Sequence, residues 1–282
     1  PAGVVNVITT RTAGKVVDAM LRDPRVRKLS FTGSTEVGRV LLRSAAENIV
    51  HCSMELGGNA PFLVFDDADL DAAVDGAMVA KMRNGGEACT AANRFYVQRG
   101  IHAAFCERLA ARMRALKLGD GTSPDVDCGP LVNRAAVTKV GELVADAVSK
   151  GARVLTGGAQ PARTGYFFEP TVLADVPAGA ALLSEEIFGP VAPIVAFDTE
   201  EEAIRLANAT EYGLVSYLYT SDLRRGLRVA EAIESGMVAL NRGLVSDPAA
   251  PFGGMKQSGL GREGAHHGIL EFLEAKYIAT NW

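Results

Sequence analysis

Two short segments combine a reactive side chain with neighbouring glycines. In the first, Asn84 to Thr90, Cys89 follows a helical pattern and has small residues on both sides. The Thr-Ala-Ala run after Cys89 would begin a helix, and a helix N-terminus lowers the pKa of a thiol. In the second, Met54 to Asn59, Glu55 lies between apolar residues and a Gly-Gly pair, so burial should raise its pKa into the range of a general base. Together they predict covalent catalysis followed by base-assisted hydrolysis, although a lone cysteine is more often a buried hydrophobe.

A third segment has the composition of an anion-binding turn. Phe31 to Gly38 follows a predicted strand, contains glycine and three hydroxyl or carboxyl side chains in succession, and leads into a predicted helix. Such turns bind anions at the N-terminus of a helix through backbone N–H groups.

Other chemical motifs are better explained by structure alone. Gly259 to Gly264 matches the GxGxxG pattern but follows a polar loop instead of a strand, so we expect a structural loop and not a dinucleotide fingerprint. His102 and Cys106 have helical spacing, yet no second ligand pair accompanies them, and the sequence predicts no metal site. The adjacent His266 and His267 diverge on a helix and are expected at the surface.

Strand and helix patterns alternate along the chain, which predicts an α/β fold with a parallel sheet covered by helices. The expected strands are Val4–Ile8, Arg27–Phe31 and Ala60–Phe65. The expected helices are Gly14–Leu21, Gly38–Asn48, Asp69–Arg83, Ala103–Leu116, Ala135–Lys150, Glu200–Ala209 and Leu223–Ser235.

Composition narrows the class of protein. The 282 residues suffice for roughly two domains. The 29 basic against 33 acidic side chains, a net charge of −4, argue against nucleic acid as a partner. No apolar run approaches the ~20 residues that cross a bilayer, so no membrane association is expected. Four separated cysteines suit a reducing compartment, which predicts a cytoplasmic protein. The missing initial Met and leader indicate the interior of a longer protein, so an organelle stays open.

Five motifs in order resemble those of the NAD(P)-dependent aldehyde dehydrogenase superfamily. They are FTGSTEVG, ELGGNAP, a cysteine 34 residues after the glutamate of that motif, EEIFGP and PFGGMKQSGLGREG. The resemblance covers the whole chain and is strongest to the succinate-semialdehyde dehydrogenase branch. It implies the corresponding fold: part of a Rossmann-like cofactor domain and an α/β catalytic domain.

The resemblance also implies roles for individual residues. Cys89 corresponds to the nucleophile and Glu55 to the general base. Contacts to NAD or NADP are implied for five residues: Gly33, Ser34, Gly57, Glu186 and Phe188. Substrate contacts are implied for Arg83, Ser246 and Phe252, with Arg83 and Ser246 holding the distal carboxylate of an acidic aldehyde such as succinate semialdehyde. A planar guanidinium suits that bidentate contact.

Two positions depart from the family pattern. Glu87 stands where glutamine is common, and its charge would raise the pKa of the thiol if it pointed inward. Ala91 replaces a second cysteine found in many close relatives, so a disulfide switch there is not expected.

The resemblance implies residues 1–57 as the second half of the cofactor domain and 58–256 as the catalytic domain. Residues 257–282 would return to the cofactor domain and end in an oligomerisation strand, giving a dimer or tetramer. The early strands, a cofactor lysine, the residue that selects NAD or NADP, an oxyanion-hole asparagine and a second substrate arginine have no counterpart here. We therefore expect these 282 residues alone to be inactive.

Two alternatives to a succinate-semialdehyde dehydrogenase remain. One is a dehydrogenase of glutarate semialdehyde or an aliphatic aldehyde, and the other is a truncated, non-catalytic binding or structural member.

Overall fold

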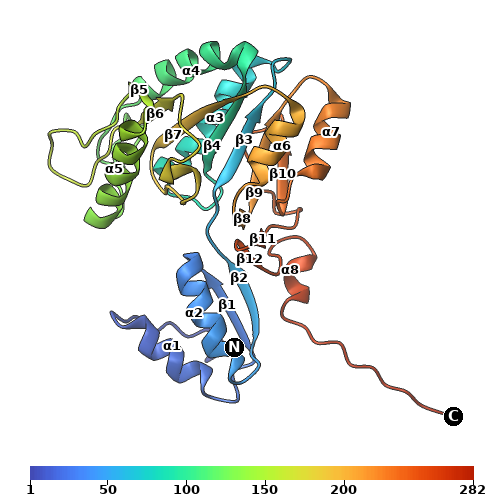
Figure 1. Ribbon diagram of the computed structural model, residues 1–282. Helices are drawn as coiled ribbons and strands as arrows, with labels where there is room; N and C mark the ends of the chain where they lie inside the picture. The colour runs from blue at the N-terminus through green and yellow to red at the C-terminus, as the bar shows by residue number, and fades with distance from the viewer.

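The computed structural model describes all 282 residues and arranges them around a small and a large sheet, one below the other in Figure 1. The small sheet has the order β1-β2-β12 and the large sheet β10-β9-β3-β4-β7-β6-β5. The strands are β1 (Lys28–Thr32), β2 (His51–Glu55), β3 (Ala60–Val64), β4 (Ala92–Gln98), β5 (Arg153–Thr156), β6 (Thr171–Ala174), β7 (Val191–Phe197), β8 (Tyr212–Gly213), β9 (Val215–Tyr219), β10 (Met237–Leu240), β11 (Met255–Lys256) and β12 (Gly259–Leu260). The helices are α1 (Ala13–Leu21), α2 (Thr35–Ala46), α3 (Leu70–Met82), α4 (Arg99–Arg114), α5 (Arg134–Ser149), α6 (Glu200–Asn208), α7 (Leu223–Ala232), α8 (His267–Leu270) and the 3-10 turns η1 (Arg83–Gly86) and η2 (Ala181–Leu183).

The small sheet joins the beginning of the chain to its end. β1 and β2 are parallel, whereas β12 runs antiparallel to β2 and pairs Gly259 with Glu55. α1 and α2 pack on this sheet around a small core that includes Leu21, Ala45 and Val50. The short β8–β11 ribbon lies between the two sheets (Figure 1).

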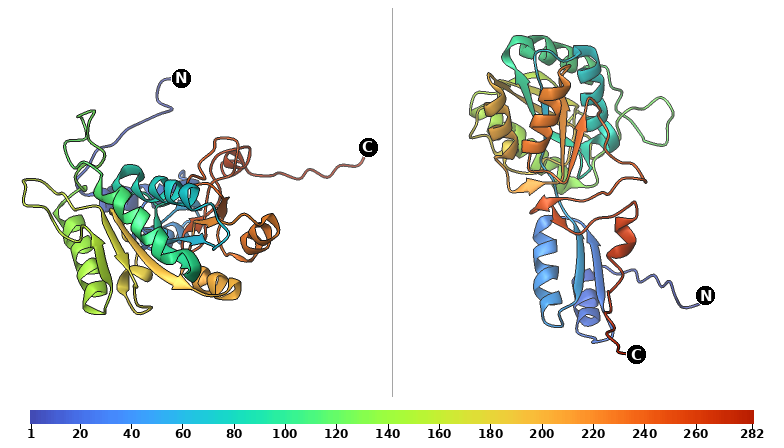
Figure 2. Two further views of the ribbon diagram at one scale, coloured as in Figure 1. Left: turned by 90° about the horizontal axis from the view of Figure 1, so that it is seen from above. Right: turned by 90° about the vertical axis from the view of Figure 1, so that its right-hand side faces the viewer.

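The large sheet is parallel except for the β5–β6 pair at its edge. Side chains alternate between its faces, so Phe62 packs with α3 and α4 while Leu63 packs with α6 and α7. Both residues are fully buried. The two views of Figure 2 show the helices on the two faces. A parallel sheet covered on both faces confirms the predicted α/β class.

Most predicted elements form, and their ends have a clear physical basis. Ser34 precedes α2, and its hydroxyl accepts a hydrogen bond from the Val37 N–H at 3.4 Å. The Asp69 carboxylate likewise accepts bonds from the first-turn N–H groups of α3. These side chains satisfy N–H groups that have no partner inside the helix.

The strand expected at Val4–Ile8 is wrong. No strand pairs with this segment, and the side chains of Val5 and Val7 are 85% and 84% exposed. Strand propensity alone does not suffice, because an extended segment is stabilised by hydrogen bonds and packing from a neighbour. The tail from Phe272 onward is also without a regular element. No helix of the structure combines the length and apolar character that crossing a membrane requires.

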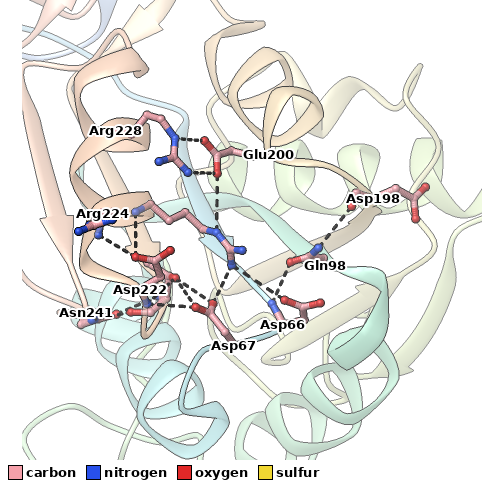
Figure 3. Close-up of polar contacts among 11 residues, drawn as sticks. Asp66, Asp67, Gln98, Asp198, Glu200, Asp222, Arg224, Arg228 and Asn241 are labelled. Atoms are coloured by element: carbon pink, nitrogen blue, oxygen red, sulfur yellow. Dashed lines mark hydrogen bonds and ion pairs between the residues drawn. The ribbon is translucent and has the colours of Figure 1, made fainter.

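A cluster of charged side chains joins several elements at the carboxyl end of the large sheet (Figure 3). Arg225 on α7 donates to Asp67, just after β3, at 3.0 Å and lies 3.7 Å from Glu200 at the start of α6. Arg228 forms two hydrogen bonds to the same Glu200 carboxylate at 2.6 and 2.7 Å. The Arg225 guanidinium also lies over the Phe65 ring. These contacts attach α6 and α7 to the sheet.

We expect Arg225→Met to lower the free energy of unfolding by about 2 kcal/mol, because it leaves the partly buried Asp67 without its cation. Arg99→Met is the matched control, since Arg99 pairs with Asp198 at the same end of the sheet but both side chains are more than half exposed. The control should change stability by less than ~1 kcal/mol. Urea unfolding measures both, and equal losses would contradict a special role for Arg225.

Candidate active site

One cavity of about 710 Å³ lies between the small and large sheets. Every site residue predicted from the sequence lines it: Gly33, Ser34, Glu55, Gly57, Arg83, Cys89, Glu186, Phe188, Ser246 and Phe252. These residues are distributed over most of the chain, so the fold is what brings them together.

The cavity forms where strands of the two sheets meet end to end. Gly33 and Ser34 follow β1 and Glu55 ends β2, so they lie at the carboxyl edge of the small sheet. Cys89 precedes β4 and Glu186 precedes β7, so they lie at the amino edge of the large sheet. The carboxyl edge of an α/β sheet is the usual place for a ligand, and here the second sheet closes over that edge.

The loop that carries Cys89 has an unusual backbone. Asn84, Gly85 and Gly86 have successive positive φ angles of 52°, 62° and 82°. The Asn84 side chain supports this turn by donating to the Glu87 carbonyl at 2.9 Å. A Cβ atom at Gly86 would lie 2.2 Å from the Gly189 carbonyl oxygen, so only glycine fits. The turn directs the chain from α3 into the cavity and back into the sheet.

The predicted helix after Cys89 is wrong, because β4 begins at Ala92. The lowered thiol pKa expected from that helix is wrong as well. Burial, with the nearby Glu186 and Glu55 carboxylates, raises the pKa of the Cys89 thiol. The backbone N–H groups of Cys89 and Thr90 oppose this shift and favour the thiolate.

Glu55 is buried, with 5% of the residue exposed, and its Oε2 has no hydrogen-bond partner. Burial and the nearby Glu263 raise its pKa to about 7, while Arg262 acts in the opposite direction. This confirms the raised pKa expected from the sequence. A carboxyl group with a pKa of about 7 and an oxygen that has no hydrogen-bond partner is suited to accept a proton.

The GxGxxG segment, Gly259 to Gly264, contains β12, which pairs with the strand that carries Glu55. Gly259 pairs with Glu55 in the β2–β12 ladder, and a Cβ on Gly259 would lie 1.8 Å from the Met54 carbonyl oxygen. With φ at +134°, this glycine permits a close approach of two strands. The segment contributes β12 and a turn, as expected of a structural loop.

Glu186 contacts the other side of the cavity. Its carboxylate accepts a hydrogen bond from the Gly58 N–H at 3.0 Å, and burial raises its pKa. A Cβ on Gly57 would lie 2.8 Å from Glu186 Oε2, so the glycine keeps that oxygen accessible. Lys139, which the sequence analysis missed, donates to the Glu186 carbonyl at 2.7 Å. A lysine on an exposed helix gives no sequence signal that separates it from other surface lysines.

These residues fit the dinucleotide that the resemblance implies. The N-terminus of α2 opens onto the cavity after Gly33 and Ser34, where free N–H groups suit a diphosphate. The Glu186 carboxylate is a suitable acceptor for ribose hydroxyls. The donor and acceptor set on this side of the cavity is therefore compatible with NAD or NADP.

Arg83 supplies an unpaired cation to the cavity. It follows the last turn of α3, lines the cavity together with Ser246 and forms no ion pair or side-chain hydrogen bond. Phe252 reaches the cavity from a segment whose backbone pairs with Glu263 through hydrogen bonds of 2.8 and 2.7 Å. A free guanidinium and a hydroxyl group that line one cavity are suited to an anionic ligand.

Glu87 does not act on the thiol as its sequence position suggested. Its carboxylate accepts a hydrogen bond from the Val132 N–H at 3.1 Å, and it contributes to the raised pKa of Cys128 instead of that of Cys89. Lys81, which is not among the predicted site residues, is fully buried and donates to Asn93 at 2.8 Å. Burial lowers the Lys81 pKa to about 7.

The aldehyde dehydrogenase family model matches residues 1–278. A succinate-semialdehyde dehydrogenase of Paenarthrobacter nicotinovorans is 57% identical over 278 residues, covering 99% of this chain and 62% of that protein. A glutarate-semialdehyde dehydrogenase of Pseudomonas putida is 55% identical over 281 residues, covering 100% and 58%. The crystal structure of an NADP dependent enzyme from E. coli is 54% identical with a TM-score of 0.97, covering 99% and 58%. The chain thus spans less than two thirds of each relative.

Replacing Glu55 should change how stability depends on pH. Because its pKa in the folded protein, about 7, lies above the ordinary value, ionisation of Glu55 destabilises the fold as pH rises toward 7. Relative to the wild type, Glu55→Gln should gain on the order of 2 kcal/mol between pH 5 and pH 8. Urea unfolding at the two pH values measures this gain. Glu142→Gln, on the exposed face of α5, is the control, and a pH-independent difference for Glu55→Gln would contradict the assignment.

Proposed function

Because this chain belongs to the aldehyde dehydrogenase family, we propose that the intact protein oxidises an aldehyde to a carboxylic acid with NAD or NADP. The observation that carries the proposal is the single cavity in which a cysteine, an open carboxylate and an unpaired arginine converge. When bound, the dinucleotide would supply the acceptor for the two electrons of the oxidation. All other steps fall to side chains of this cavity.

Cys89 is the nucleophile. Its sulfur attacks the aldehyde carbon to form a thiohemiacetal, which oxidation converts into a thioester. Since burial disfavours the thiolate, the reaction depends on the N–H groups of Cys89 and Thr90 and on a group that removes the thiol proton. Glu55, with its pKa about 7, is the base available in the same cavity.

Glu55 also acts on water after the oxidation. A water molecule that loses a proton to the Glu55 carboxylate attacks the thioester carbonyl, and the acid leaves as Cys89 is released. A group with a pKa close to neutral can take up and return this proton in each cycle.

Succinate semialdehyde is the proposed substrate. Arg83 and Ser246 provide the contacts that a carboxylate at the far end of the aldehyde needs. The relatives named for succinate and glutarate semialdehydes act on aldehydes that both carry such a carboxylate. Glutarate semialdehyde is therefore the second candidate, distinguished by chain length and not by charge, and an uncharged aliphatic aldehyde fits the free Arg83 less well.

The proposed domain bounds and oligomeric state are those implied by the family resemblance, and the proposed compartment is the one that the separated cysteines predict. Residues 1–57 and 257–282 belong to the cofactor domain and 58–256 to the catalytic domain, in agreement with the return of β12 to the small sheet. The protein functions as a homo-oligomer, a dimer or tetramer, in the cytoplasm. The alternative is a non-catalytic binding member, which predicts no turnover despite a folded cavity.

Cys89→Ala should abolish aldehyde oxidation, because no other side chain of the cavity can form the thioester. Steady-state formation of reduced cofactor with succinate semialdehyde measures the loss in the intact protein. Cys52→Ala is the matched control, since Cys52 lies on β2 outside the cavity, and should retain activity. Substantial turnover by Cys89→Ala would exclude the proposed mechanism.

Arg83→Ala should reduce kcat/KM for succinate semialdehyde by about 30-fold or more, the effect of leaving a desolvated carboxylate unpaired. An uncharged aldehyde of similar length should be affected much less, because it has no carboxylate to lose a partner. Arg205→Ala, on exposed α6, is the control for removal of a positive charge. Equal losses for the charged and uncharged aldehydes would indicate that Arg83 has a structural role.

A further inference from the structure

Tyr217 lies beneath the loop that carries Cys89 and is not part of the cavity lining. It is on the central strand β9, is 2% exposed and packs against the Phe62 ring. Its hydroxyl donates to the Thr90 carbonyl at 2.8 Å. A buried hydroxyl costs free energy unless it is hydrogen-bonded, so this contact fixes the position of Thr90 relative to the sheet.

Thr90 connects this hydrogen bond to the reactive sulfur. Its carbonyl is held by Tyr217, and its N–H is one of the two backbone groups that favour the Cys89 thiolate. The carbonyl and the N–H lie on either side of the same Cα atom, so they are related by the two backbone dihedrals of Thr90. Fixing the carbonyl therefore limits the directions in which the N–H can point.

The rest of the loop gives Thr90 little other support. Beyond the 3-10 turn and its cap at Glu87, one backbone hydrogen bond within the loop joins Ala91 to Ala88, and the Glu87 side chain accepts from the Val132 N–H. On the opposite side, a Cβ on Gly58 would lie 2.4 Å from the Cys89 carbonyl oxygen, so Gly58 confines the loop by contact alone. Tyr217 supplies the hydrogen bond from the interior of the sheet.

We infer that Tyr217 is a positioning residue: by holding the Thr90 carbonyl it restricts the backbone of Thr90, so that the N–H of the same residue stabilises the Cys89 thiolate. This inference rests on the proposed role of Cys89 as nucleophile. It adds a residue outside the cavity that sets the reactivity of the sulfur through one hydrogen bond.

The same strand provides a matched control. Tyr219 lies two residues further along β9, on the same face, is 3% exposed and stacks on the same Phe62 ring. Its hydroxyl forms no hydrogen bond within the chain and lies against Gly76 of α3. Tyr217→Phe and Tyr219→Phe therefore remove the same atom from the same core, and only the first removes a contact with the loop.

The test measures the reactivity of the thiol directly. The intact protein, without aldehyde or cofactor, is treated with iodoacetamide between pH 6 and pH 10, and alkylation of Cys89 is followed by peptide mass spectrometry. Tyr217→Phe should raise the apparent pKa of this alkylation by about 0.5 to 1 unit, as loss of support for one hydrogen bond to the thiolate implies. Tyr219→Phe should leave the profile within ~0.2 units of the wild type. The rate for Tyr217→Phe near pH 7.5 should fall about three- to tenfold.

Two results would overturn the inference: an unchanged profile for Tyr217→Phe, or equal shifts for both variants, which would indicate general loosening of the core. If Tyr217→Phe does not fold, 3-fluorotyrosine at position 217 replaces it. This residue has nearly the same volume and is a stronger donor, so it should lower the apparent pKa, and an unchanged value would again contradict the inference. Alkylation needs no substrate. If Tyr217→Phe shifts the alkylation profile as expected but the wild type oxidises no aldehyde, only the proposed function is refuted.

Discussion

Burial of three ionisable groups in one cavity is the physical constraint on which this structure depends. Burial raises the pKa of Glu55, Cys89 and Glu186, and the charge of each carboxylate also disfavours ionisation of the thiol. Burial in the cavity thus disfavours the charged form of all three groups. Chemistry that needs a thiolate must be supported by directed hydrogen bonds, because the surroundings oppose the charge.

The fold supplies those hydrogen bonds from rigid elements. The Gly58 N–H holds the Glu186 carboxylate, and Tyr217 on β9 holds the loop whose N–H groups favour the Cys89 thiolate. Each support comes from the start or the interior of a strand in the large sheet, where packing leaves little freedom. Glu55, in contrast, keeps an oxygen without a partner. The site therefore restrains the loop of the proposed nucleophile, Cys89, and leaves one oxygen of the proposed base, Glu55, without a hydrogen-bond partner.

Because the cavity lies between two sheets, each sheet contributes a different set of functional groups to it. The carboxyl edge of the small sheet contributes a helix N-terminus and Glu55, while the amino edge of the large sheet contributes Cys89 and Glu186. β12 couples the two, since it pairs with the strand that ends in Glu55 and follows the segment that carries Phe252. A change in the relative position of the sheets would alter the base and the nucleophile at once.

The sequence by itself determined the α/β class, most helices and the raised pKa of Glu55, because hydrophobic periodicity, capping residues and an acid between apolar neighbours act locally. Through motifs that resemble a family, it also identified ten of the 18 residues that line the cavity. Only the tertiary structure decided what depends on distant neighbours. Val4–Ile8 has strand propensity but no pairing partner, and the residues after Cys89 continue into β4 where a helix was expected. The raised thiol pKa, the hydrogen bond from the Val132 N–H to Glu87 and the hydrogen bond from Tyr217 to Thr90 all depend on segments far apart in the chain, so no local pattern predicts them.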